Sequence, residues 1–242
     1  MHLATFPLMQ TIFKVLALLP WIDWIAAVVF FAVWASYVRF ARQPFGNHRS
    51  ILVATNAVRH QWMMQVTYRE VRVVDGVVIQ NLSTGPSFFA STTILIIGGL
   101  LAVLGTDKAN EMVRDLPFAA RTSTLIFDMK LILLLGVFVY SFFRFTWALR
   151  QYTFGALLIA AAPDAERFTS ENLSREAFAD KAGRVVGLAA ETFNDGLRGY
   201  YFAFAAIGWF FSPTIFMLAT VGVVYILYHR EFRSEVLSAL TS

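Results

Sequence analysis

The sequence has no cysteine and few charged residues. Without cysteine the chain has no disulfide, no thiolate metal ligand and no cysteine nucleophile, and thiol usage says nothing about the redox compartment. Only 15% of its 242 residues are charged, whereas 57% are hydrophobic. Soluble domains carry about 25% charged residues. A soluble fold of this length could not bury so much apolar surface, so the composition predicts an integral membrane protein.

The common catalytic and phosphate-binding motifs are also missing. There is no glycine-rich phosphate loop, no G-x-S-x-G and no H-E-x-x-H. The histidines lie outside the apolar segments, which excludes a haem held by paired axial ligands within the membrane. His48 and His60 lack the i, i+4 spacing of a helical metal site, so we expect no metal and no cofactor. Basic residues cluster beside apolar segments, so we expect no nucleic-acid partner.

Four apolar segments are long enough to cross a bilayer, which takes about 20 residues. They are residues 21–40, 86–105, 123–144 and 203–228. Residues 1–20 are predicted to lie in the membrane interface, and residues 41–85 and 145–200 to form helical regions in the cytoplasm. The predicted fold is an all-α integral membrane protein, a four-transmembrane-helix bundle with helices extending into the cytoplasm, in a single domain of residues 1–242.

The local structure of two stretches needs a choice between alternatives. Asp75-Gly76 is typical of a tight turn, so its surroundings are predicted to form either a strand-turn-strand or a break between helices. The fourth apolar segment contains Ser212 and Pro213. A hairpin broken there would have arms of only about 13 to 15 residues, so we expect one tilted or kinked helix.

The charge of the connecting loops predicts the orientation. Residues 39–84 carry six arginines against two acids, whereas bases and acids balance in residues 105–122. By the positive-inside rule the long loops are cytoplasmic and the amino terminus lies outside a cell membrane, which we expect to be a bacterial inner membrane. A single fourth span would put the carboxyl terminus outside. Arg230 and Arg233 favour the cytoplasm, so the side of the tail stays open.

Asp128 and Lys130 interrupt the third apolar segment. Two residues apart, they lie about 200° apart around a helix and cannot pair with each other. Counted from the arginines at the cytoplasmic ends of the first and third segments, Asp23, Asp128 and Lys130 share a layer about 21 to 24 Å away. We predict Asp23 as the partner of Lys130, and water or Arg121 as the partner of Asp128. This layer is either the outer end of an ion path or an interhelical pair that fixes register.

A basic cluster is predicted at the cytoplasmic boundary from Arg144, Arg150 and Arg198. These arginines either bind anionic lipid headgroups and attract anions, or mark the interface and pair with acids such as Glu191 and Asp195. Both interpretations place a layer of positive charge where the helices leave the bilayer.

Small residues mark two places where helices can approach closely. Gly196 and Gly199 lie where a cytoplasmic helix enters the bilayer, and there we expect either a hinge or, more simply, a close helix crossing. Gly98, Ala102 and Gly105 follow one another at spacings of four and three in the second apolar segment. This spacing lets another helix pack against that segment.

Three stretches resemble the signatures of an uncharacterised membrane family of bacteria and plants, domain of unknown function 599. They are GPSFFASTTILIIGGLLAVLG, RQYTFGALLIAAAP and GLRGYYFAFAAIGWFFSPTIFMLATVGVVYILYHRE. The resemblance implies a multi-pass helical protein and carries no established activity, so it assigns no catalytic residue. It places Tyr152, Gly196, Tyr200, Tyr201 and Pro213 within family motifs.

Three functions are compatible with these features. The first is an oligomeric channel or transporter-like assembly, because one four-helix subunit offers little room for an aqueous path. The second is a non-catalytic structural or accessory subunit of a larger membrane complex. The third is an enzyme acting on lipid headgroups at the arginine-rich boundary. The expected partners are the lipid bilayer, further copies of the chain or another membrane protein, and anionic lipid.

Overall fold

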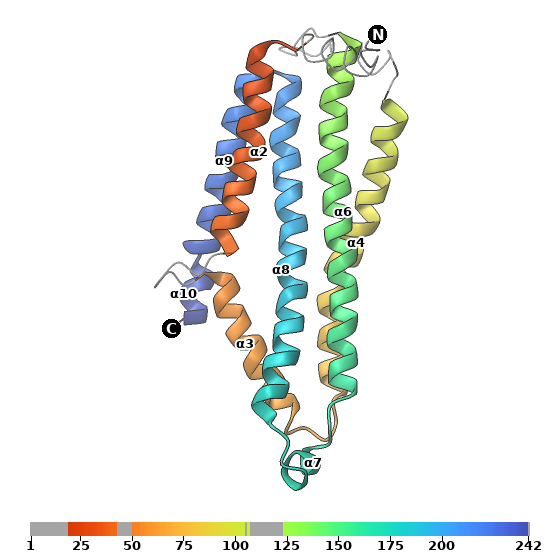
Figure 1. Cartoon of the computed structure of the whole chain (residues 1–242), viewed down its shortest axis with the longest axis vertical. Helices are drawn as coiled ribbons and strands as arrows, with labels where there is room; N and C mark the ends of the chain where they lie inside the picture. The colour runs from red at the N-terminus through yellow and green to blue at the C-terminus, as the bar shows by residue number, and fades with distance from the viewer. Residues whose placement is uncertain (1–18, 43–49, 105, 107–122, 242) are drawn as a thin grey trace, which may run out of the picture.

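The computed structural model describes residues 19–42, 50–104, 106 and 123–241 (Figure 1). Helices make up almost all of this part of the chain, and it contains no strand. The helices are α2 (Trp21–Arg42), α3 (Ile51–Val66), α4 (Val73–Val103), α6 (Thr124–Ala160), α7 (Ala165–Ser170), α8 (Arg175–Ile207), the 3-10 helix η1 (Gly208–Phe210), α9 (Pro213–Phe232) and α10 (Glu235–Thr241). The predicted all-α class is confirmed, whereas nearly all of the predicted interfacial segment 1–20 lies outside the described residues.

Four helices are long and apolar enough to cross a membrane, as predicted. They are α2, α4, α6 and the stretch that begins with α9 at Pro213. Two of them are much longer than a bilayer core, which is about 30 Å thick. The 31 residues of α4 and the 37 residues of α6 correspond to about 46 and 55 Å. Each of these helices therefore extends well beyond its membrane-spanning part.

The Asp75-Gly76 dipeptide lies inside a helix. Neither predicted alternative holds at the dipeptide itself, because the break between helices lies before it: α3 ends at Val66 and α4 begins at Val73. Asp75 occupies the first turn of α4, where its negative charge stabilises the helix by interacting with the positive end of the helix dipole. Its buried carboxylate accepts a hydrogen bond from the Trp62 indole at 2.7 Å and pairs with Arg69, so it ties α3 to α4.

The predicted fourth span, residues 203–228 as one helix, is wrong. The helix breaks between Ile207 and Pro213, and α9 runs back along α8. Trp209 stacks on Phe216 at 5.1 Å, and Arg230 donates to the Tyr201 hydroxyl far along both helices, so the two arms are antiparallel. Proline favours the first position of a helix because it has no N–H to donate.

A hairpin was not expected because its arms were counted within the fourth apolar segment alone. In the structure neither arm is confined to that segment. One arm is the end of the 33-residue helix α8, and the other is the whole of α9, with 20 residues. The hairpin places the end of α8 beside α6 and α9, at the level of the four apolar helices. It also brings α10 back against α3, about midway along the bundle (Figure 1).

Helix α8 lies at the centre of the bundle and packs against α6, α3 and α9 (Figure 1). The upper core joins α2, α6, α8 and α9 and is aromatic, with Phe30, Phe202 and Phe216 fully buried; α2 and α9 lie in the upper half of Figure 1. The lower core, around Met63 and Val186, joins α3 with α4, α6 and α8, and α3 lies in the lower half of Figure 1. The bundle therefore has one core at the level of the apolar crossings and another beyond it.

Candidate functional site

Three helical elements meet at Trp209. The indole Nε1 of Trp209 donates to Oδ1 of Asp23 at 2.6 Å, and Nζ of Lys130 donates to the backbone carbonyl of Trp209 at 2.8 Å. Asp23 is 6% exposed and Lys130 3% exposed, so both charged groups are buried. We call these three residues the Trp209 cluster. It connects the start of α2, the first turns of α6 and the turn between α8 and α9.

The structure brings Asp23 and Lys130 to the predicted common layer, but the contact between them is indirect. Among the described residues they make no ion pair within 4 Å, and Trp209 lies between them, with Nζ of Lys130 also 5.8 Å from its ring centroid. Trp209 is not among the site residues predicted from the sequence. Two general rules explain its contacts with Asp23 and Lys130. A buried indole N–H needs an acceptor, and the last carbonyls of a helix need donors from outside the helix.

Asp128 lies on a different side of α6 from Lys130, as their spacing predicted. It is partly buried, whereas Lys130 is fully buried. Arg121, the partner predicted for Asp128, lies outside the described residues. The assignment of Asp128 therefore stays a prediction.

A second charged group surrounds Asp195 on α8. Its Oδ2 is 3.1 Å from Nη2 of Arg144, and its Oδ1 is 3.0 Å from Nη1 of Arg198. Asp195 is 2% exposed and Arg198 6%. Nη2 of Arg198 also lies 4.0 Å from Oε2 of Glu231 on α9. We call Arg144, Asp195, Arg198 and Glu231 the Asp195 network.

The Asp195 network holds further elements together. Oε1 of Glu231 accepts the backbone N–H of Leu52 at 3.2 Å, which attaches the start of α3. The Arg198 guanidinium lies over the Tyr37 ring of α2 at 5.7 Å. A polar cavity of about 30 Å³ adjoins Arg198, Glu231 and Tyr201. That volume holds two or three water molecules, since each needs roughly 10–15 Å³.

Arg150 does not belong to this network, contrary to the prediction that grouped it with Arg144 and Arg198. Its side chain is exposed and lies over the Phe154 ring at 5.7 Å. Six residues separate it from Arg144, which corresponds to about 9 Å along the helix and about 240° around it. The predicted cluster was based on position along the sequence and ignored the direction of each side chain.

Aromatic rings fill the interior between the two charged groups. Lys130 and Arg144 are separated by 14 residues of α6, or about 21 Å. Within this interval the Phe30 ring lies 5.6 Å from Phe202 and 5.0 Å from Phe216, and Trp34 stacks on Phe202 at 5.0 Å. In the described part of the chain, the centre of a single subunit is thus packed with rings.

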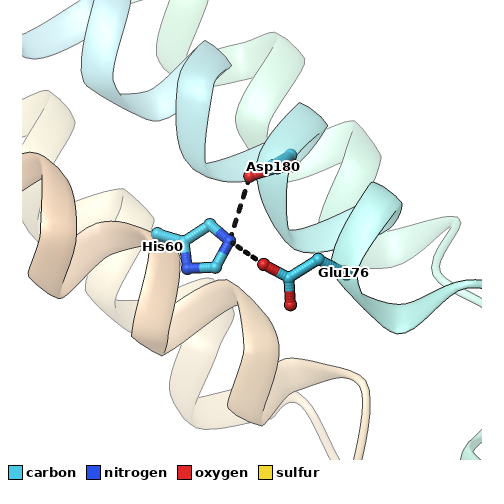
Figure 2. A group of neighbouring side chains, drawn as sticks. All are labelled: His60, Glu176 and Asp180. Atoms are coloured by element: carbon cyan, nitrogen blue, oxygen red, sulfur yellow. Dashed lines mark ion pairs between the residues drawn. The ribbon is translucent and has the colours of Figure 1, made fainter.

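One group of side chains in the described residues has the composition of a metal site (Figure 2). His60 on α3 faces Glu176 and Asp180 on α8. Nε2 of His60 is 3.3 Å from Oε1 of Glu176 and 3.1 Å from Oδ1 of Asp180. We call these three residues the His60 site, and they lie far from both charged groups of the apolar crossings.

Comparison with protein families matches residues 25–236 to a family described as "Protein of unknown function, DUF599". The chain belongs to this family. Comparison with curated proteins and with solved structures finds no match. The resemblance inferred from the sequence motifs is thus confirmed.

Two of the DUF599 motif positions, Gly196 and Tyr200, shape the packing of α8 together with the neighbouring Gly199. A Cβ added at Gly196 would come within 2.4 Å of the Phe145 ring, and the hydroxyl of Ser141 similarly occupies the space beside Gly199. Close crossing of α8 and α6, rather than a hinge, therefore explains both glycines. Tyr200 shares a hydrogen bond of 2.7 Å with Thr93, which ties α8 to α4.

The other DUF599 motif positions have structural environments as well. Tyr201 accepts a hydrogen bond from Arg230 across the hairpin, and Pro213 begins α9. Tyr152 is buried in the lower core, beside Arg59. Burial lowers the pKa of Arg59, and the neighbouring Tyr152 and Glu191 partly oppose that shift. None of these contacts requires a bound ligand.

Proposed function

We propose that the protein is a multi-pass cell-membrane protein whose copies assemble through α4 and form a channel or transporter-like path between subunits. The observation that supports this proposal is an exposed row of small and uncharged polar residues along α4, which we call the α4 seam. It consists of Gln80, Thr84, Ser87, Ser91, Gly98 and Ala102.

The α4 seam occupies one side of the helix. At about 100° per residue its members lie within about 60° of one another. The buried side chains of α4, among them Ile79, Ala90 and Thr93, point away from the seam. A Cβ added at Gly98 would meet no atom within 4 Å, so the surface there is open. Within membranes, helices meet along small residues, so the α4 seam suits contact with a further helix.

A path between subunits agrees better with the packing than a path through one subunit. The aromatic rings around Phe30 and Phe202 fill the interior of the described chain between the Trp209 cluster and the Asp195 network. Several copies arranged with the α4 seam toward an axis would line that axis with the hydroxyls of Ser87 and Ser91. Hydroxyl groups and narrow apolar stretches are common linings of selective pores.

The second candidate is an accessory subunit whose α4 seam binds a different membrane protein. The same small residues support it, because they fit any closely packed helix. An enzyme acting on lipid headgroups has less support. The cavity beside Arg198 measures about 30 Å³, too small for a headgroup, and Arg150 is not among the residues that line it.

Cysteine cross-linking distinguishes these candidates, because the native chain has no cysteine. We expect Ser91→Cys to form disulfide-linked dimers of the chain in membranes. Leu218→Cys, on the exposed face of α9, is the control and should stay monomeric. Liposomes containing the purified chain should show ion flux that Ser91→Leu lowers. Cross-linking of Ser91→Cys to another protein, without flux, would favour the accessory subunit, and no cross-link at all would contradict both.

We also expect the carboxyl terminus to lie in the cytoplasm with α3. The contacts of α10 with α3, and of Glu231 with Leu52, keep the end of α9 beside α3. A green fluorescent protein fused after Ser242 should fluoresce, and alkaline phosphatase fused there should be inactive. The same two reporters inserted between α3 and α4 are the control. Active phosphatase at the carboxyl terminus alone would contradict the hairpin.

A further inference from the structure

We propose that His60, Glu176 and Asp180 bind a divalent transition-metal ion, in a centre independent of the function proposed for α4. One imidazole nitrogen and two carboxylate oxygens face each other across the α3–α8 contact, and the three ligand atoms lie within 4.8 Å of one another (Figure 2). Mixed nitrogen and oxygen ligands suit zinc, manganese or iron better than magnesium or calcium, which prefer oxygen alone.

The distances match those between ligands of one ion. Zinc binds histidine nitrogen and carboxylate oxygen at about 2.0–2.2 Å, so two ligands of a tetrahedral ion are about 3.3–3.5 Å apart. Nε2 of His60 lies 3.3 Å from the Glu176 oxygen and 3.1 Å from the Asp180 oxygen. The two carboxylate oxygens lie within 4.8 Å of each other, and rotation of these exposed side chains can bring them to the spacing of two ligands of one ion.

The histidine nitrogen is buried and makes no hydrogen bond. Although two carboxylate oxygens are within 3.3 Å, neither accepts from Nε2 with acceptable geometry. The oxygens therefore lie to the sides of the direction in which the ring nitrogen points (Figure 2). Ligands of a shared ion take that arrangement, whereas a protonated imidazole paired with a carboxylate would direct its N–H at one oxygen.

The backbone holds the two sides of the site together. Glu176 and Asp180 are four residues apart on α8, so both project from the same face of that helix. One turn further along, Gly183 lies directly against α3, and a Cβ there would come within 3.2 Å of the Cα of His60. The ligands are therefore brought together by the close packing of two helices, without any loop having to move.

A cleft of about 590 Å³ adjoins the His60 site. It is lined by residues that include His60, Asp180, Asn56, Arg184 and Glu191. Three protein ligands leave at least one coordination position of a tetrahedral ion open, as in metal sites that bind water or a small ligand. Because His60 and Asp180 also line the cleft, that open position would be reached from it.

Metal binding to the full chain in nanodiscs tests the proposal. The protein should be purified through a tag without histidine, and Zn²⁺ and Mn²⁺ serve as probes in titration calorimetry and in metal analysis after dialysis. We expect one ion per chain. We also expect Glu176→Gln and Asp180→Asn each to weaken binding by at least about tenfold, a loss that even supporting residues of metal sites produce. The side chains of Glu176 and Asp180 are 65% and 69% exposed, so both variants should fold.

The control is Glu166→Gln, which removes an exposed carboxylate on α7 and should leave the affinity unchanged. Bound metal should also raise the unfolding temperature of the native protein and not that of His60→Ala, because only a folded site gains from the ligand. Equal binding by the native protein and Asp180→Asn, or no binding at all, would overturn the proposal and leave His60 as a surface ion-pair partner.

Discussion

Asp195→Asn lowers the free energy of unfolding by about 3 to 5 kcal/mol, the cost of removing one partner from a buried charged group. The carboxylate of Asp195 is shared by Arg144 and Arg198, so its loss leaves two guanidinium groups side by side without their common anion. Glu231 compensates only partly, because its oxygen is 4.0 Å from Arg198 and it has no contact with Arg144 among the described ion pairs. Unfolding by titration with sodium dodecyl sulfate measures the effect.

A matched control comes from the same helix. Glu191→Gln changes an acid one turn from Asp195 that is only partly buried, and we expect it to cost less than about 1 kcal/mol. If Asp195→Asn prevents folding altogether, adding Arg144→Gln should restore part of the stability by removing one unpaired cation. Equal small losses for the two acids would show that the Asp195 network contributes little to the fold.

Lys130→Met and Asp23→Asn each destabilise the protein by about 3 to 5 kcal/mol as well. After either change the remaining buried charge loses the opposite charge of its layer and keeps its contact with Trp209: the indole N–H for Asp23, or the carbonyl for Lys130. The double variant should cost less than the sum of the single variants, since it leaves no unpaired charge. Strictly additive losses would mean that the two groups do not interact across Trp209.

The same variants separate a structural role of the Trp209 cluster from a role in conduction. If the cluster only fixes the register of α2, α6 and the hairpin, folded Asp23→Asn and Lys130→Met proteins should conduct as the native chain does in liposomes. Altered flux in a variant that still assembles would favour the outer end of an ion path. Trp209→Phe is the matched change, because it keeps the ring stacked on Phe216 and removes only the indole donor.

The positions of charged residues along the helix axes could be predicted well from the sequence, because the rise per residue of an α-helix is nearly constant. That regularity placed Asp23 and Lys130 in one layer, and it placed Arg144 with Arg198 in another. Directions around the helices were harder. Arg150 has a suitable height and still points away from the Asp195 network, since it lies about 240° around α6 from Arg144.

Contacts made through breaks in helices could not be predicted in this way. Trp209 belongs to the Trp209 cluster because α8 ends just before it and α9 turns back at Pro213. The expectation of one kinked helix placed Trp209 inside a span and gave no reason to bring it to the first turns of α2 and α6. The choice between a kink and a hairpin depends on where the flanking helices pack. The order of apolar residues in the fourth segment does not reveal that packing.

The His60 site shows a further limit. His60 and its two acidic neighbours are separated by more than a hundred residues, and spacing rules for metal sites detect ligands on one helix or one loop. The i, i+4 pair of Glu176 and Asp180 is visible in the sequence, but such pairs are common on solvated helix faces. Only the contact of Gly183 with the backbone of α3 tells which histidine faces them.

The hairpin of α8 and α9 also bears on how the chain enters its membrane during synthesis. The part of α8 at the level of the apolar crossings is too short and polar to count among the four apolar helices, whereas insertion of a lone helix takes about 20 apolar residues. We expect this arm to stay out of the lipid until α9 has left the ribosome. The end of α8 and α9 would then enter the lipid as one unit. The bend at Pro213 would enter first, and the arginine-bearing ends of the two arms would follow.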